Sequence, residues 1–253
     1  MNHLLSPFLK DYNYFSHVFH GKIVLPHDQF NLDNLSPYSL HDLERHTRLA
    51  TIDESYYKDL NILDLGCHIG YFSYLYKQLG AKSVHGVNKR QYPIDVANYV
   101  FGQLKQTNYT FDVADTEGKN YLSKVCQGKD TVLLTLALEH LKNPLWVLQQ
   151  ITDSDVKNII FESSLYEANS EPALKYYLQD SSVQTRNFDE GKEFCLGAVP
   201  NLKWIELAFY NLGWQIKRME KHFNFNENWF SVPNHQSPPR TYESVFMLAT
   251  KFS

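Results

Sequence analysis

Residues 61–73 constrain the fold of this 253-residue chain more than any other segment. They read N-I-L-D-L-G-C-H-I-G-Y-F-S, a short apolar run that carries Asp64 and is followed by Gly66 and Gly70. Residues 71–79 then have the pattern of a helix. A strand, a tight glycine turn and a helix in this order form the opening unit of a nucleotide-binding α/β sheet.

The residue types of this turn indicate what kind of ligand it suits. Gly66 allows the backbone to leave the strand sharply, and Gly70 allows a helix N-terminus to lie close to a ligand. Asp64 precedes the first glycine, and a carboxylate there suits a ligand with a cationic group and hydroxyls. It does not suit a pyrophosphate.

Two common phosphate-binding motifs do not match. A dinucleotide fingerprint, G-x-G-x-x-G, would need glycine at positions 68 and 71, where this chain has His68 and Tyr71. A phosphate loop, G-x-x-x-x-G-K-[ST], does not occur in the chain. Residues 61–73 could also form a Rossmann-like βα turn that binds no cofactor.

The rest of the chain predicts alternating strands and helices. Further strands are expected at residues 83–87, 110–114, 131–136, 158–161, 214–219 and 244–250. Helices are expected at residues 92–105, 145–151 and 201–211. This alternation predicts an α/β fold with a mostly parallel sheet that is covered by helices on both faces.

Composition narrows the class of protein. No run approaches the roughly 18 apolar residues of a membrane span, and no charged-then-apolar signal peptide opens the chain. The three cysteines, Cys67, Cys126 and Cys195, are odd in number and widely spaced, which favours a reducing, cytoplasmic compartment and offers no zinc site. The net charge of −4 gives no basic field for nucleic acid, although a local basic patch stays open.

The glycine turn resembles motif I of the class I S-adenosylmethionine-dependent methyltransferases, whose usual form is D-x-G-x-G-x-G. Asp64, Gly66 and Gly70 match, and His68 replaces the middle glycine. The resemblance covers about residues 61–253. It implies a Rossmann-like sheet of seven strands with a terminal antiparallel hairpin, one strand of which lies beside strand five.

The same resemblance implies S-adenosylmethionine as the cofactor. Asp64 would face its sulfonium and its methionine ammonium, and Asn88 would accept from the ribose hydroxyls where the family usually has an acid. Asp115, rather than Asp112, would accept from the adenine amino group, although a three-residue shift of the strand would exchange them. The implied cofactor-binding residues are Asp64, Gly66, Cys67, His68, Gly70, Asn88, Asp115 and Leu136.

Two basic residues follow Asn88, which is unusual beside a cationic cofactor. Lys89 and Arg90 are interpreted either as a solvated turn or as a site for an anionic group on the ligand.

The segment after the fourth strand resembles the E-H-L segment of many small-molecule methyltransferases. His140 could take a proton from the acceptor as the methyl group is transferred, or it could only pack at the start of the next helix. Glu139 is expected to orient or cap. The chain lacks [DNS]-P-P-[YF], which disfavours methylation of an adenine or glutamine amide nitrogen, and it lacks the Pro-Cys dipeptide of cytosine C5 methylation. It also lacks an acid at the strand tip for magnesium, so no metal is expected.

Substrate choice is expected to come from outside the core sheet. Residues 1–57 form an N-terminal extension or lid, in which Tyr38, His41 and His46 are candidate cleft residues or plain surface residues. Residues 58–253 form the methyltransferase-like domain, with an insertion at about 163–200 that is long enough for a binding lid. An aromatic segment at 223–242 either contacts substrate or covers the sheet edge.

These features together predict a methyltransferase that acts on a small molecule, with oxygen as the expected acceptor atom. One alternative is an enzyme like the tRNA wobble-uridine (carboxy)methyltransferases, which share the insertion and a pattern echoed by Thr185-Arg186-Asn187 and Pro200-Asn201. Another is a non-catalytic binding protein on the same fold, since His68 and Asn88 depart from the cofactor motifs. The sequence carries no signal for an oligomeric state.

Overall fold

The computed structural model describes residues 10–16, 18, 21, 26–29, 51–118, 121–166, 171–180, 194–224 and 242–252. Tyr38, His41 and His46 lie outside these ranges. So do Thr185-Arg186-Asn187 and residues 225–241 of the aromatic segment.

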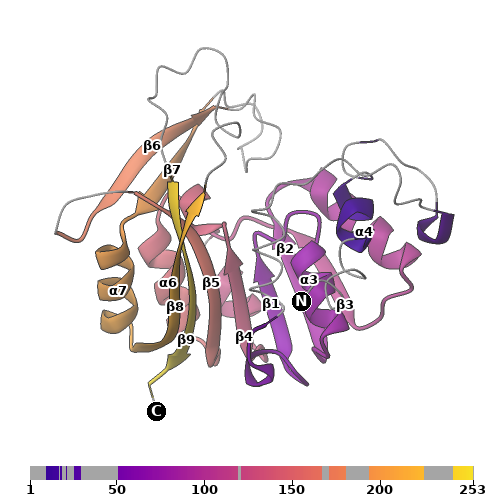
Figure 1. The fold of residues 1–253 in the computed structure, drawn as a ribbon, viewed down its shortest axis with the longest axis horizontal. Helices are drawn as coiled ribbons and strands as arrows, with labels where there is room; N and C mark the ends of the chain where they lie inside the picture. Colours follow the sequence, from indigo (N-terminus) through magenta and orange to yellow (C-terminus); the bar gives the residue numbers. More distant parts are fainter. Residues whose placement is uncertain are drawn as a thin grey trace.

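A seven-stranded sheet forms the centre of the molecule (Figure 1). Its order is β3-β2-β1-β4-β5-β9-β8. The first five strands are parallel, and β9 runs antiparallel to both β5 and β8. The strands are β1 (Asn61–Leu65), β2 (Ser83–Asn88), β3 (Tyr109–Val113), β4 (Thr131–Thr135), β5 (Asn158–Leu165), β8 (Trp214–Asn224) and β9 (Tyr242–Lys251). The predicted sheet and its terminal antiparallel hairpin, with one strand beside strand five, are confirmed.

Helices cover both faces of this sheet, because side chains alternate along each strand. Ile160 of β5 packs in one core with α3 (Tyr71–Gln78), α4 (Gln91–Gln103) and buried residues of the N-terminal segment. Ile159 and Phe161 pack in the other core with α5 (Tyr121–Val125), α6 (Pro144–Thr152) and α7 (Leu202–Asn211). The predicted two-sided α/β architecture is therefore present.

The predicted insertion folds as a separate antiparallel pair, β6 (Leu174–Asp180) and β7 (Phe194–Pro200). It follows β5, which continues to Leu165 and so is longer than the expected 158–161. In Figure 1 this hairpin rises beyond the upper edge of the large sheet. β7 contacts β5 and the short helix η4 (Leu138–His140) that follows β4.

Asn201 anchors the base of the hairpin. Its Oδ1 accepts from the backbone N–H groups of Ala173 at 3.0 Å and Trp204 at 2.8 Å, and its Nδ2 donates to the carbonyl of Glu171 at 2.7 Å. The residue therefore caps the N-terminus of α7 and fixes the chain entering β6. Asn201 belongs to the Pro200-Asn201 pair that resembles the tRNA wobble-uridine enzymes, and in this chain it has a structural role.

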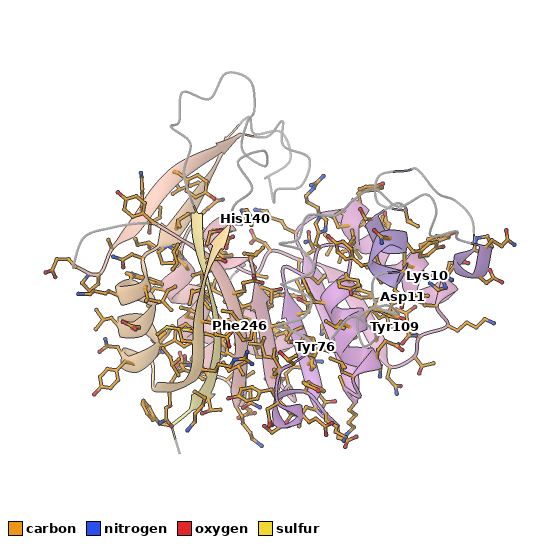
Figure 2. All side chains as sticks on the ribbon, in the orientation of Figure 1. Lys10, Asp11, Tyr76, Tyr109, His140 and Phe246 are labelled. Carbon is orange, nitrogen blue, oxygen red and sulfur yellow. The ribbon has the colours of Figure 1, made fainter. Side chains whose placement is uncertain are left out.

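The described part of the N-terminal extension packs on α3 and α4. Residues 10–16 are helical, and Tyr14 and Phe15 have no exposed surface. The Tyr74 hydroxyl donates to Asp11 at 2.7 Å, and His27 of η1 (His27–Gln29) lies 2.6 Å from the same carboxylate. Figure 2 shows Asp11 at the α3–α4 end of the sheet, well separated from His140.

No helix within the described ranges is long and apolar enough to cross a membrane.

Candidate functional site

A pocket lies at the carboxyl ends of the parallel strands, where β1 has β2 on one side and β4 on the other. Chain connections leave β1 and β4 in opposite directions at this point, which is where open α/β sheets bind ligands. The pocket holds about 570 Å³ of space, including open solvent. It is lined by Leu65, Gly66, Val87, Asn88, Lys89, Asp115, Thr116, Glu117, Leu134, Ala137, His140, Leu141, Lys142, Val147 and Leu196.

Gly66 forms the turn at the end of β1. Its φ is +79°, a left-handed conformation that L residues adopt at a cost. Its N–H and that of Cys67 both donate to the carbonyl of Val87, at 2.9 and 3.0 Å. A Cβ at Gly66 would lie 2.7 Å from the Cβ of Ala137. Conformation and space therefore both require glycine at this position.

Gly70 and His68 hold the rest of the turn in left-handed geometry. Gly70 is the N-cap of α3 at φ +78°, and a Cβ there would lie 2.8 Å from the ring of Phe111. The absence of a side chain at Gly70 thus allows close packing against β3. His68 replaces the middle glycine of the motif and keeps a φ of +49°, a conformation that histidine tolerates better than most residues.

Asp64 lies beneath this turn and is 1% exposed. The Ser73 hydroxyl of α3 donates to its Oδ2 at 2.7 Å, which ties α3 to β1. Burial, together with the negative charge of Asp64, raises the pKa of the Cys67 thiol well above its ordinary value. Asp64, Cys67, His68 and Gly70 therefore support the turn from below or beside it, outside the lining of the pocket.

Asn88 ends β2 at the pocket and is 2% exposed. Its Oδ1 accepts from the backbone N–H of Arg90 at 2.9 Å, which bends the chain toward α4. The next residue, Lys89, lines the pocket, and its Nζ lies 3.3 Å from Oδ2 of Asp115. Lys89 therefore faces the pocket, where its ammonium group is close to the Asp115 carboxylate.

The structure separates the two candidate acids after β3. Asp115 lines the pocket, and its Oδ1 accepts from the N–H of Glu117 at 3.0 Å. Asp112 points away on β3, where its side chain is 59% exposed and lies 2.8 Å from Nε2 of His85. The expected orientation of Asp112 toward solvent is what the structure has.

Glu117 is a pocket residue that the sequence did not indicate. Its carboxylate accepts from the backbone N–H groups of Asn143 at 2.6 Å and Lys142 at 3.0 Å. These bonds join the loop after β3 to the loop after β4, on either side of the pocket. A single acid in a loop belongs to no periodic pattern, so only the folded chain reveals that Glu117, which is half-buried, makes this link.

His140 is half-buried and lines the pocket from η4. Figure 2 places it near the upper edge of the sheet, under the hairpin. Leu196 of β7 contributes to the same lining, and sequence reasoning missed it because strand β7 lies outside the core sheet. Leu136, a predicted cofactor residue, is outside the lining. It takes φ +51° and donates its N–H to the carbonyl of Glu162 at 2.7 Å.

Within the described ranges, no three histidine, cysteine, aspartate or glutamate side chains gather as metal ligands would. The polar groups of the pocket are instead amide, carboxylate, ammonium and imidazole groups at the ends of β2, β3 and β4.

Comparison with known proteins gives a likeness of fold. No protein-family model matches the sequence, and no curated protein matches it. Among solved structures, the N-terminal domain of EvdMO1 in the presence of SAH and D-fucose has a TM-score of 0.62 at 15% identity, covering 88% of this chain and 90% of that chain. An S-adenosylmethionine-dependent methyltransferase from Mesorhizobium loti has a TM-score of 0.55 at 16% identity, covering 87% and 100%. The [4+2]-cyclase SpnF has a TM-score of 0.61 at 11% identity, covering 98% and 93%.

The three alignments cover most of this chain, so the likeness is one of overall fold. The chain has the fold of the class I S-adenosylmethionine-dependent methyltransferases.

Proposed function

We propose that this protein transfers the methyl group of S-adenosylmethionine to a small molecule, with oxygen as the acceptor atom. The observation that carries the proposal is the Gly66 turn, where neither the backbone conformation nor the 2.7 Å approach to Ala137 leaves room for a side chain. Such a turn, at the point where the chain connections diverge, lets a ligand approach the backbone closely.

The residues at the pocket fit this cofactor. Adenosine offers hydroxyl and amino donors, and the strand ends offer acceptors in Asn88 and Asp115. Asp64 lies buried under the turn, and its negative charge favours a cationic ligand group above it. Leu134, Ala137 and Val147 give the pocket an apolar side.

Bound S-adenosylmethionine supplies a methyl group on a positively charged sulfur, which an oxygen nucleophile can take in one displacement. The protein's part is alignment, exclusion of water and removal of one proton. His140 lines the pocket, and an imidazole is the side chain most suited to accept a hydroxyl proton near neutrality. Leu141 and Leu196 form apolar walls beside it.

The comparisons support this proposal through fold. The N-terminal domain of EvdMO1 was crystallised with SAH bound, and again in the presence of SAH and D-fucose. D-fucose, present in the second crystal structure, is a small molecule with several hydroxyl groups.

An assay with labelled S-adenosylmethionine tests the proposal. The acceptor is the low-molecular-weight fraction of an extract of the source cells, and formation of S-adenosylhomocysteine is measured. We expect turnover with the wild-type chain, and His140→Ala to lower turnover at least about tenfold while affinity for S-adenosylhomocysteine stays within about threefold. Equal loss of both would make His140 a structural residue, and absence of turnover would contradict methyl transfer to a small molecule.

Lys89 favours a second candidate, an enzyme like the tRNA wobble-uridine (carboxy)methyltransferases. A lysine beside Asn88 in the pocket could pair with an additional carboxylate on the cofactor, although here it lies 3.3 Å from Asp115. Retention of the protein on tRNA at moderate salt separates this candidate from a small-molecule enzyme.

SpnF is a [4+2]-cyclase, so proteins of similar fold carry out other reactions. The third candidate function is binding without catalysis. Binding of S-adenosylhomocysteine without turnover in the extract assay would favour it.

A further inference from the structure

A second cluster of polar side chains lies next to His140, on the side of η4 that faces β5. Its members are Glu139, Ser163, Ser164 and Ser244, from η4, β5 and β9. Glu139 is 6% exposed, Ser163 is fully buried and Ser244 is 1% exposed. None of the four belongs to the lining of the pocket described above.

Glu139 is the centre of this cluster. The Ser164 hydroxyl donates to its Oε1 at 3.1 Å. The Ser163 hydroxyl, which donates to the Ser164 carbonyl at 3.0 Å, lies 3.5 Å from its Oε2. The Tyr177 hydroxyl of β6 donates to the Glu139 carbonyl at 3.2 Å, so the insertion hairpin also holds this residue. Hydroxyl groups of β5 and β6 thus surround Glu139 on both its side chain and its backbone.

Ser244 joins the cluster through the β5–β9 pairing. Ser164 and Ser244 lie directly opposite each other in this antiparallel pair, so their side chains are on the same face. Directly opposite residues have Cβ atoms about 4.5–5.5 Å apart. The Ser244 hydroxyl is therefore a near neighbour of the Ser164 hydroxyl that binds Glu139.

The Ser244 hydroxyl is buried and has no hydrogen-bond partner. A buried hydroxyl without a partner is destabilising, and alanine at this position would avoid that cost. A ligand hydroxyl at this point would supply the partner. The half-buried Ser164 gives the cluster a side that reaches solvent.

We propose that Glu139, Ser164 and Ser244 form the acceptor-substrate subsite, and that they bind a hydroxyl group of an uncharged, polyhydroxylated small molecule. This inference rests on the proposed function, because it gives a substrate class to the same active site. Glu139 and His140 are consecutive residues of η4, and His140 lines the pocket.

The chemistry of the cluster argues against two other substrate classes. A carboxylate or phosphate on the substrate would meet the like charge of Glu139 in a region of low dielectric, where repulsion is strong. A purely apolar group would leave the carboxylate and the serine hydroxyls desolvated without new partners. Hydroxyl groups avoid both costs because they donate and accept.

The first experiment measures thermal unfolding of the ligand-free protein. Ser244→Ala should leave Tm unchanged within about 1 °C or raise it, because it removes a buried hydroxyl that has no partner. Ser164→Ala is the matched control on the opposite strand and should lower Tm, because it breaks a hydrogen bond to Glu139. A fall in Tm for Ser244→Ala as large as that for Ser164→Ala would overturn the proposal.

The second experiment divides the low-molecular-weight extract on an anion exchanger before the labelled-cofactor assay. Label should enter the unretained fraction, and Ser244→Ala should lower turnover about tenfold or more at limiting acceptor, without changing affinity for S-adenosylhomocysteine. Ser123→Ala, on the exposed face of α5, is the control and should behave as wild type.

Transfer of label into the retained, anionic fraction would contradict the proposal, as would full turnover by Ser244→Ala. Absence of label in both fractions with the wild-type chain would instead count against the proposed function, while the unfolding measurement still decides whether Ser244 lacks a partner in the free protein.

Discussion

At the level of single residues, Gly66 is the position that most strongly supports a cofactor site at the end of β1. Its left-handed φ costs a residue with a Cβ about 1–2 kcal/mol, and the Cβ would also overlap Ala137 at 2.7 Å. The turn and the loop after β4 therefore meet at van der Waals distance only because this residue has no side chain.

Gly66→Ala should reduce affinity for S-adenosylhomocysteine at least about tenfold, because the turn and Ala137 must move apart. Gly66→Val should abolish binding. Gly128→Ala is the matched control: Gly128 also has a positive φ, at +67°, but nothing lies within 4 Å of its added Cβ. Titration calorimetry reports affinity and circular dichroism reports folding. Unchanged affinity in a folded Gly66 variant would remove the basis of the cofactor assignment.

Asp64 has two separable roles, a charge beneath the turn and an acceptor for Ser73. Asp64→Asn keeps an acceptor for the Ser73 hydroxyl but removes the charge, so we expect affinity for S-adenosylmethionine to fall about tenfold. Ser73→Ala keeps the charge and breaks the bond, so it should lower Tm with affinity within about threefold of wild type. The opposite pattern would mean that Asp64 only anchors α3.

The sequence predicted some of these residues and not others, for physical reasons. Gly66 and Asp115 follow strand ends, and strand ends of a parallel sheet meet at one edge, so position along the chain was enough to place them at the pocket. Glu117 and Leu196 were missed because their places depend on loops and on an inserted hairpin. Leu136 lies outside the pocket lining because its left-handed backbone turns the chain into η4.

At the scale of elements, the β6–β7 hairpin connects the insertion to the site. Leu196 lines the pocket, and Tyr177 donates to the carbonyl of Glu139. The length of residues 163–200 predicted both an insertion and a binding role for it. The sequence did not predict that β6 and β7 pair with each other, or that β7 contacts η4. These contacts depend on the three-dimensional fold and leave no local pattern in the sequence.

Leu196→Ala should alter the acceptor dependence of turnover, raising KM for the extract acceptor about threefold to tenfold, because it removes an apolar wall beside His140. Tyr176→Ala is the control on the same hairpin. Tyr176 is 50% exposed and lies outside the pocket lining. Tyr176→Ala should have the same steady-state kinetic constants as the wild-type chain. Equal effects of the two substitutions would show that the hairpin acts only through its overall stability.

At the scale of the whole molecule, the N-terminal segment is part of the core. Phe15 has no exposed surface and lies between the rings of Tyr71, Tyr74 and Phe101. Tyr74 and Asp11 are 63 residues apart in sequence but share a hydrogen bond. No local pattern could predict this packing, whereas the alternation of strands and helices predicted a mostly parallel sheet with helices on both faces.

Phe15→Ala should lower the free energy of unfolding by about 3–5 kcal/mol, as for other buried phenylalanines, and so lower Tm by roughly 6–20 °C. Tyr92→Ala, on the exposed side of α4, is the control and should shift Tm little. Thermal unfolding checks both. A small shift for Phe15→Ala would mean that the segment is not docked in solution.

The proposed function requires that the pocket bind the adenosyl cofactor of methyl transfer. Calorimetric titration of the purified chain with S-adenosylmethionine and S-adenosylhomocysteine, with NAD as the control, tests it most directly. Micromolar binding of the first two, about −8 kcal/mol, with none of NAD is the predicted result. Binding of NAD alone, or of none of the three, would contradict the account.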